Sequence, residues 1–239
     1  MIRLAAFAAL LAGAIHAQPA EFAAASVKPN ASGERRSITS TSRGKTRMNN
    51  ETLRALIQTA FDVRDYSLIG PSWLDSERFD IVGKIPAGVS RAQIPAMLQA
   101  LLKNRLGLVF HWEPREFSGF ALVTAAKGAK IKPVEPTDKS SYLIGDRMIQ
   151  VRQQTMEQFA RLLERMLDRP VQDLTGMPGL FDFTLLWWPD GAPADPSGDV
   201  PPLSLLTALQ DQFGLQLRAQ KVTVRTLVVD HIERVPSAN

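Results

Sequence analysis

The chain repeats one order of secondary structure, and this repeat constrains its fold more than any other feature of the 239 residues. Residues 52–123 predict an amphipathic helix, a turn, a strand, a second helix and two further strands. The same order returns over residues 155–229. Corresponding positions carry similar residues: Phe79-Asp80-Ile81 with Phe181-Asp182-Phe183, Leu106-Gly107-Leu108 with Phe213-Gly214-Leu215, and Phe120 and Leu122 with Leu227 and Val229.

A duplicated unit of this size predicts an α+β fold of two small sheet-and-helix lobes with approximate two-fold symmetry. Each unit is a helix–strand–helix–strand–strand unit that alone would bury little apolar area, so we expect one body made of two lobes. The expected organisation is a signal peptide at 1–17, an N-terminal strand, loop and first repeat at 18–126, a linker at 127–147, a second repeat at 148–235 with a flexible insertion at 189–202, and a tail at 236–239.

The pattern also predicts individual elements. Asn50 is expected to cap the first helix, after a polar loop over residues 31–45. A hairpin-like connection is expected at residues 114–119, between strands over 108–113 and 120–124. Gly107 and Gly214 each lie where a helix passes into a strand, a position that often requires a positive φ angle.

The first residues indicate export. Arg3 is followed by an uncharged apolar run over residues 4–15, and Ala17 offers a small residue at a cleavage point. This order is typical of a secretory signal peptide, so we expect a periplasmic or extracellular protein. A retained N-terminal anchor is the alternative. We expect no stable membrane span after cleavage, because no second long apolar stretch follows.

Composition excludes several classes of site. The absence of cysteine excludes disulfides, thiol catalysis, a lipidated N-terminal cysteine and cysteine-based metal sites. The net charge is only +4, and the positive residues are scattered apart from Arg35-Arg36 and the run from Arg43 to Arg47. That run lies among Ser, Thr and Gly, which favours a solvated loop. We expect no nucleic-acid partner, because a dense basic face with stacking aromatic residues is missing.

Two aspartates and two histidine–glutamate pairs are the candidates for a catalytic or metal site. Asp80 and Asp182 occupy equivalent positions and would be the pair of an acid–base site, although a polar outward position, or a bond to a nearby backbone amide, is the favoured interpretation. His111 with Glu113, and His231 with Glu233, each supply two ligands on one strand face, whereas zinc needs a third. We therefore assign no catalytic residue, no metal and no cofactor. Gly44-Lys45-Thr46 lacks the first glycine of a phosphate loop, and no Gly-x-Ser-x-Gly elbow occurs.

Three tryptophans are the candidate binding residues. Trp187 and Trp188 are adjacent on a predicted strand, so their side chains point to opposite sides. At least one indole is therefore expected outside the core, where it would contact a partner or a saccharide. Ordinary packing against the insertion is the favoured interpretation. Trp73, in the turn over residues 70–73, is the third candidate.

The sequence resembles a family of uncharacterised secreted bacterial proteins that is expanded as paralogues in soil bacteria. The matching segments are Ala25–Asn30, Gly70–Leu74, Arg78–Ile81, Met97–Gln99 with Leu101-Leu102, Gly128–Lys130, Asp173–Gly176, Gly179–Phe183, Gln212–Leu215 and Pro236–Asn239. The domain also looks like one at the tail of membrane metallopeptidases of the beta-lactam-sensor type. The Leu-Gly-Leu half of each repeat is similar to the short N-terminal domain of secretins and TonB-dependent receptors. The resemblance supplies no activity.

These observations predict a non-enzymatic, exported module that binds an envelope protein or a cell-wall component. Two alternatives remain open. One is a periplasmic hydrolase that uses the pair Asp80 and Asp182. The other is a sensory ectodomain that cooperates with a membrane peptidase.

Overall fold

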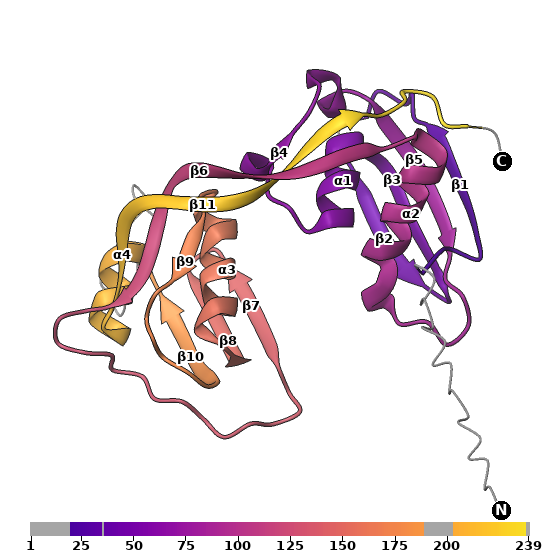
Figure 1. Ribbon diagram of the computed structural model, residues 1–239. Coiled ribbons are helices and arrows are strands. Elements are labelled where there is room, and N and C mark those ends of the chain that lie inside the picture. Colours follow the sequence, from indigo (N-terminus) through magenta and orange to yellow (C-terminus); the bar gives the residue numbers. More distant parts are fainter. Residues whose placement is uncertain (1–19, 35, 189–202, 238–239) are drawn as a thin grey trace, which may run out of the picture. The chain divides into compact units, whose positions relative to one another are not determined.

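The computed structural model describes residues 20–34, 36–188 and 203–237 (Figure 1). They form helices and three separate sheets, which confirms the α+β class. The chain divides into two compact units. Unit 1 contains the chain up to Asp62, Gly70–Val109 and the chain from Val229 onward, whereas unit 2 contains Val63–Ile69 and Phe110–Val228. The predicted signal peptide and the insertion at 189–202 lie outside the described residues.

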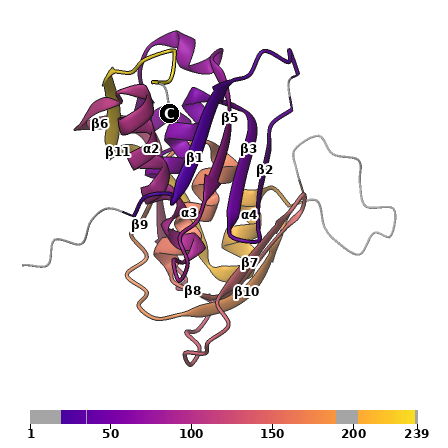
Figure 2. The ribbon, with the colours of Figure 1, turned by 90° about the vertical axis from the view of Figure 1, so that its right-hand side faces the viewer.

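Unit 1 is built on a four-stranded antiparallel sheet in the order β1-β5-β3-β2 (Figure 2). The strands are β1 (Ala24–Pro29), β2 (Ile38–Ser42), β3 (Lys45–Thr52) and β5 (Arg78–Lys84). The prediction of a loop over residues 31–45 was therefore wrong. Ile38–Ser42 is rich in residues that favour strands, and it finds its partners in β3, from Ile38 opposite Asn49 to Ser42 opposite Lys45.

Two helices cover one face of this sheet: α1 (Leu53–Phe61) and α2 (Ile94–Leu106), which pack against each other. Two 3₁₀ turns, η2 (Ser72–Asp75) and η3 (Arg91–Gln93), precede β5 and α2 respectively. Phe79 and Ile81 of β5 are fully buried, whereas the alternate residues of this strand are partly or fully exposed. The cap of α1 is Thr52, whose hydroxyl accepts the Ala55 N–H at 3.1 Å, so the predicted capping role of Asn50 was wrong.

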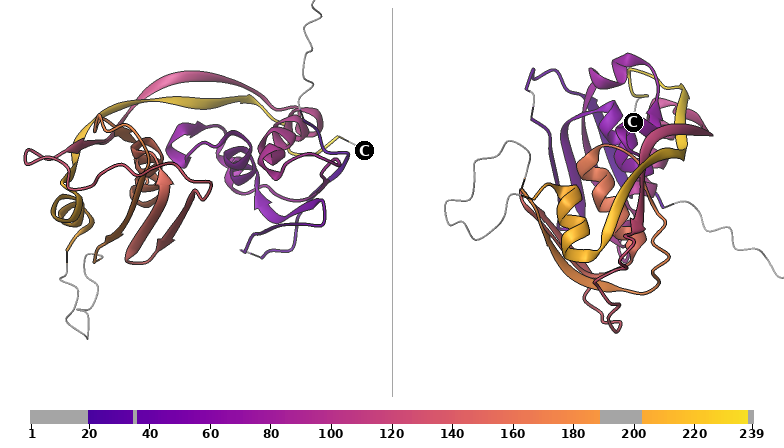
Figure 3. Two further views of the ribbon diagram at one scale, coloured as in Figure 1. Left: turned by 90° about the horizontal axis from the view of Figure 1, so that it is seen from below. Right: turned by 90° about the vertical axis from the view of Figure 1, so that its left-hand side faces the viewer.

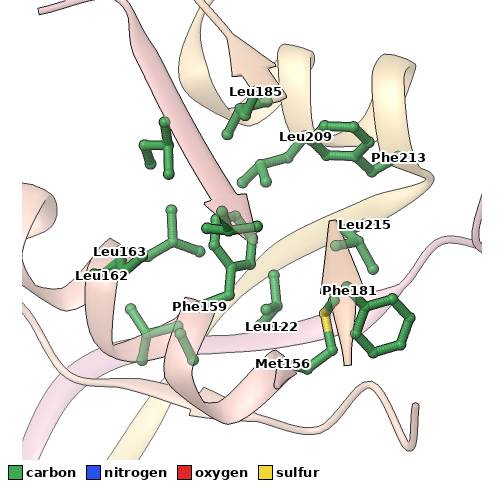
Figure 4. Packing of buried hydrophobic residues seen from close by; sticks show 14 of the residues in the cluster. Leu122, Met156, Phe159, Leu162, Leu163, Phe181, Leu185, Leu209, Phe213 and Leu215 are labelled. Carbon is green, nitrogen blue, oxygen red and sulfur yellow. The ribbon is translucent and has the colours of Figure 1, made fainter. Parts of the chain in front are cut away.

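Unit 2 contains a three-stranded sheet in the order β10-β8-β7, formed by β7 (Ser141–Gly145), β8 (Met148–Gln154) and β10 (Phe181–Leu186). The helix α3 (Met156–Leu167) begins with the predicted capping box, in which Thr155 and Gln158 bond reciprocally. A short α4 (Leu205–Ala208) continues into a π-helical turn, η4 (Leu209–Phe213). The helices and strands of unit 2 contribute apolar side chains to one buried cluster (Figure 4), which includes Leu122, Phe159, Leu163, Phe181, Leu185 and Phe213. Trp187 belongs to the same cluster.

Two long strands, β6 (Val109–Thr124) and β11 (Leu215–His231), lie side by side (Figures 1 and 3). They are the central strands of a sheet in the order β4-β11-β6-β9, with β4 (Leu68–Ile69), which follows the 3₁₀ turn η1 (Asp65–Ser67), and β9 (Val171–Asp173) at its edges. The predicted connection at 114–119 was wrong, because β6 continues through it. Gly119 makes no turn there; a Cβ at this position would collide with the Pro170 carbonyl oxygen, so glycine permits a close approach.

The strand order of the two units corresponds element by element. β2, β3 and β5 of unit 1 match β7, β8 and β10 of unit 2 in order and direction. The predicted linker at 127–147 contains β7 and also an element that matches β1. The Asn30 N–H donates to the carbonyl of Arg78, two residues before Asp80. In the same way, the Val134 N–H donates to the carbonyl of Leu180, two residues before Asp182. A repeated Lys-Pro, at Lys28-Pro29 and at residues 132–133, was the sequence signal for this match. Origin by duplication remains a prediction.

Candidate anion-binding face

The predicted tryptophan site does not lie on the surface. Trp187 and Trp188 are each 6% exposed, so the expectation of an exposed indole was wrong. Trp187 belongs to the core of unit 2, and the Arg147 guanidinium covers the Trp188 ring at 3.6 Å. Both sides of this strand end are therefore covered. Trp73 is half-buried, and the Arg234 guanidinium lies 4.7 Å from the centre of its ring.

The two equivalent aspartates have a local structural role. Asp80 Oδ1 accepts the Asn50 backbone N–H at 2.8 Å, and Asp182 Oδ1 accepts the Gln153 backbone N–H at 2.7 Å. Asn50 and Gln153 are buried and have positive φ angles of 56° and 53°. A backbone bent in this way turns its N–H out of the strand ladder, and the aspartate supplies the missing acceptor. We call this arrangement the aspartate clasp, and it confirms the favoured interpretation of a bond to a backbone amide.

Each histidine pair joins residues two positions apart in the chain, within β6 for His111 and at the end of β11 for His231. His231 Nε2 lies 2.9 Å from Glu233 Oε1, and His111 Nε2 lies 3.8 Å from Glu113 Oε2. Within the described residues, no group of three or more histidine, cysteine, aspartate or glutamate side chains is placed to hold a metal ion.

An open groove of about 500 Å³ in unit 2 is lined by α3, β9 and β11. Its charged groups already have partners. Arg161 bonds to Glu157 at 2.7 Å, and Glu164 accepts the Val171 N–H at 3.1 Å. Burial raises the pKa of the Glu164 carboxyl, and burial together with the charge of Glu164 raises the pKa of the Tyr66 hydroxyl beside it. These internal contacts already satisfy the charged groups that would otherwise bind a ligand in this groove.

The outer face of the unit 1 sheet differs from all these sites. Residues paired directly across antiparallel strands project from the same face, so the register defines the surface. One row is Ala24, Lys84, Lys45 and Ser42, and the next is Ser26, Val82, Arg47 and Ser40. Lys28 lies opposite Asp80 in a third row, and Arg43 lies at the tip of the β2–β3 hairpin. We call this surface the cationic face.

The cations of this face have no counter-ions in the described part of the chain. Lys28, Arg43, Lys45, Arg47 and Lys84 are all exposed, and none forms an ion pair or a side-chain hydrogen bond with another described residue. Lys45 lies directly opposite Lys84, an arrangement that destabilises a sheet through like-charge repulsion. The nearest carboxylate in the register, Asp80, already accepts bonds from the Asn50 amide and the Asn30 side chain.

The side chains between these cations are small. Ser26, Ser40, Ser42 and Ala24 leave the charged groups room to converge, and the serine hydroxyls add hydrogen-bond donors. Near the hairpin the face is hollowed: Ser42, Arg43, Lys45 and Arg47 line a pocket of about 530 Å³. Aromatic residues do not occur in these rows, so the face has no platform on which bases or sugar rings would stack.

The chain belongs to the family described as protein of unknown function DUF3738, whose model matches residues 54–232. No curated protein and no solved structure matches it. Backbone hydrogen bonds connect two of the segments that carry the family resemblance, Gly128–Lys130 and Gln212–Leu215. The Lys130 N–H donates to the Phe213 carbonyl, and nearby the Ala125 N–H donates to the Gly214 carbonyl.

The cationic face was not predicted from the sequence, because the run from Arg43 to Arg47 was assigned to a solvated loop. The alternation of that run, with charge at every second residue, was the available signal.

Proposed function

We propose that this protein is an exported, non-enzymatic binding module of the bacterial envelope, and that it binds an anionic ligand through the cationic face. One observation carries the proposal: five exposed cations share one sheet face, and none of them has a carboxylate partner among the described residues. Export rests on the predicted signal peptide at 1–17. The ligand would be a cell-wall component or an acidic envelope protein.

Electrostatic attraction explains why such a face persists. Repulsion between Lys45 and Lys84 costs stability in the free protein and is relieved when an anion lies between them. The attraction is strongest at low ionic strength and is screened above about 0.15 M salt, where the Debye length falls to about 8 Å. Binding is therefore expected to weaken steeply as salt rises.

The aspartate clasp argues against the alternative of a hydrolase with a carboxylate pair. Asp80 and Asp182 each use an oxygen to hold a backbone amide of their own unit. The oxygen that accepts this amide is engaged in holding the fold and is not free to take a proton from a substrate. The sensory alternative rests on the resemblance alone. No helix within the described ranges is long and apolar enough to cross a membrane.

The test compares two triple variants of the chain that starts after Ala17. The face variant carries Lys45→Gln, Arg47→Gln and Lys84→Gln. The matched control carries Arg91→Gln, Lys132→Gln and Lys139→Gln, which remove the same charge from exposed positions elsewhere. The probe is dextran sulfate, with uncharged dextran as the blank, and binding is measured by calorimetry at 50 and 500 mM salt.

We expect the face variant to bind dextran sulfate at least about tenfold more weakly than wild type at 50 mM salt, because each lost charge-assisted contact weakens binding. The control should stay within about twofold, and the wild type should lose binding at 500 mM salt. Thermal unfolding should show no loss of stability in the face variant, since it removes a like-charge pair. Equal weakening in both triple variants, or no binding by the wild type, would reject the proposal.

A further inference from the structure

The tip of the β2–β3 hairpin places an arginine in a costly backbone conformation. Ser42 pairs with Lys45, so the turn contains only Arg43 and Gly44, with φ angles of 49° and 70°. A two-residue turn with two positive φ angles favours Asn, Asp or Gly at its first position. A long side chain there is strained, so a charge is kept at the tip at the expense of stability.

The tip is held in a fixed place within unit 1. The Ile85 N–H donates to the Gly44 carbonyl at 2.8 Å, which ties the turn to the chain that leaves β5. Behind the tip, Lys45 and Arg47 project from alternate positions of β3 into the hollow that Ser42 and Arg43 also line. Three cations and one hydroxyl therefore surround a single pocket on an anchored hairpin.

We infer that this hollow binds a phosphate group, an inference that rests on the proposed function of the cationic face. The planar guanidinium of arginine offers two parallel N–H donors that match two phosphate oxygens, and the pocket has two such groups, on Arg43 and Arg47. The Lys45 ammonium adds a point charge, and the Ser42 hydroxyl adds a neutral donor. A tetrahedral phosphate presents oxygens in several directions, whereas a carboxylate presents two oxygens in one plane.

The strain at Arg43 makes the inference testable without loss of the fold. The variant Arg43→Asn removes the guanidinium and introduces a residue that this turn accepts readily. We expect it to melt about 2–4 °C higher than the wild type, because the strain is relieved. It should nevertheless bind inorganic polyphosphate at least about tenfold more weakly. Weaker binding by a more stable protein cannot result from unfolding.

Two further comparisons separate phosphate recognition from simple charge attraction. Arg43→Lys keeps the charge but loses the two-pronged donor, so it should weaken binding of polyphosphate by about three- to tenfold. A guanidinium also pairs with a carboxylate, so the second comparison uses the wild type, which should bind polyphosphate at least about tenfold more tightly than polygalacturonate, a carboxylate polymer. Arg91→Asn is the matched control at an exposed position outside the hollow, and it should bind both polymers as the wild type does.

The outcomes distinguish this inference from the proposed function. If the wild type binds polygalacturonate as tightly as polyphosphate, or if both Arg43 variants bind polyphosphate normally, the phosphate inference is rejected while binding of dextran sulfate still supports the cationic face. If no polyanion binds, both are rejected. Vesicles of phosphatidylglycerol provide the last arm: Arg43-dependent binding to vesicles alone assigns the phosphate to a lipid headgroup, and Arg43-dependent binding to soluble polyphosphate assigns it to a polymer.

Discussion

Unit 1 and unit 2 use the same backbone arrangement and present different surfaces. In both, a strand bends at a positive-φ residue before its helix, and an aspartate of the neighbouring strand accepts the buried amide that the bend turns out of the ladder. The outer sheet face of unit 2 carries Leu143, Gln150 and Thr184 in one row, Gly145, Met148 and Leu186 in the next, and a single cation, Arg152, opposite Ser141 in a third. The cationic face occupies the corresponding surface of unit 1.

This difference separates structural residues from candidate functional ones. The aspartate clasp recurs because the bent backbone needs an acceptor in either unit. Outward side chains of a sheet have no such obligation, so they vary without loss of the fold. The five cations without an ion-pair partner among the described residues are therefore the feature on which the proposed binding rests.

The largest difference is expected at the paired glycines. Gly107 and Gly214 have φ angles of 60° and 65°, which confirms the prediction that both lie in the left-handed region. Gly107→Ala should cost about 1 kcal/mol, because the added Cβ would meet only Glu233 Cγ, at 3.6 Å. Gly214→Ala should cost about 3 kcal/mol or more, because its Cβ would collide with the Gly128 carbonyl oxygen.

Urea unfolding of the two single variants measures this difference. Gly128→Ala, at a positive-φ position where a Cβ would meet no other residue, serves as the control for backbone strain alone. It should resemble Gly107→Ala. Similar losses at Gly107 and Gly214 would show that the two helix ends are packed alike, contrary to the structure.

A smaller difference is expected between the two aspartates. Asp80→Ala should lower the free energy of unfolding by about 2–3 kcal/mol, because it leaves the buried Asn50 amide without an acceptor and also releases Asn30. Asp182→Ala should cost about 1–2 kcal/mol, because its second bond, from Gln153 Nε2 at 3.4 Å, is long. Asp80→Asn and Asp182→Asn keep the acceptor oxygen and should cost less. Unchanged stability in both alanine variants would remove the structural role of the clasp.

The smallest effect on stability is expected at Glu164 of unit 2, whose contacts with Tyr66 and Val171 have no counterpart in unit 1. Burial raises the pKa of its carboxyl in the folded protein, so folding favours the protonated form. Its contribution to stability is therefore present at low pH and is lost as the pH rises through the pKa of the folded state. Glu164→Gln keeps the oxygen that accepts the Val171 N–H, and it should raise the melting temperature at pH 7 but not at pH 4. A shift that is the same at both values would contradict this cause.

Much of the local structure follows from the sequence, because it depends on near neighbours in the chain. The capping box at Thr155 and Gln158 and the positive φ angles of Gly107 and Gly214 were all predicted. Each needs only a few residues and a helix end. The same reasoning misassigned the cap of α1, because Asn50 and Thr52 are equally good caps and only the bend of β3 decides between them.

Tertiary structure decided the features that depend on distant partners. The sequence predicts a turn at Gly119, but this residue lies within the continuous strand β6, where the Pro170 carbonyl oxygen approaches it closely. The run from Arg43 to Arg47 reads as a loop, but the strand β5 pairs with it and aligns its charges with Lys84. Trp187 and Trp188 read as partly exposed, but Arg147 covers one and the unit 2 core the other. The sequence determined which residues alternate along the strands and which glycines at helix ends take a positive φ angle. Only pairing between distant strands decided which of them share a face, because that register is set by contacts remote in the chain.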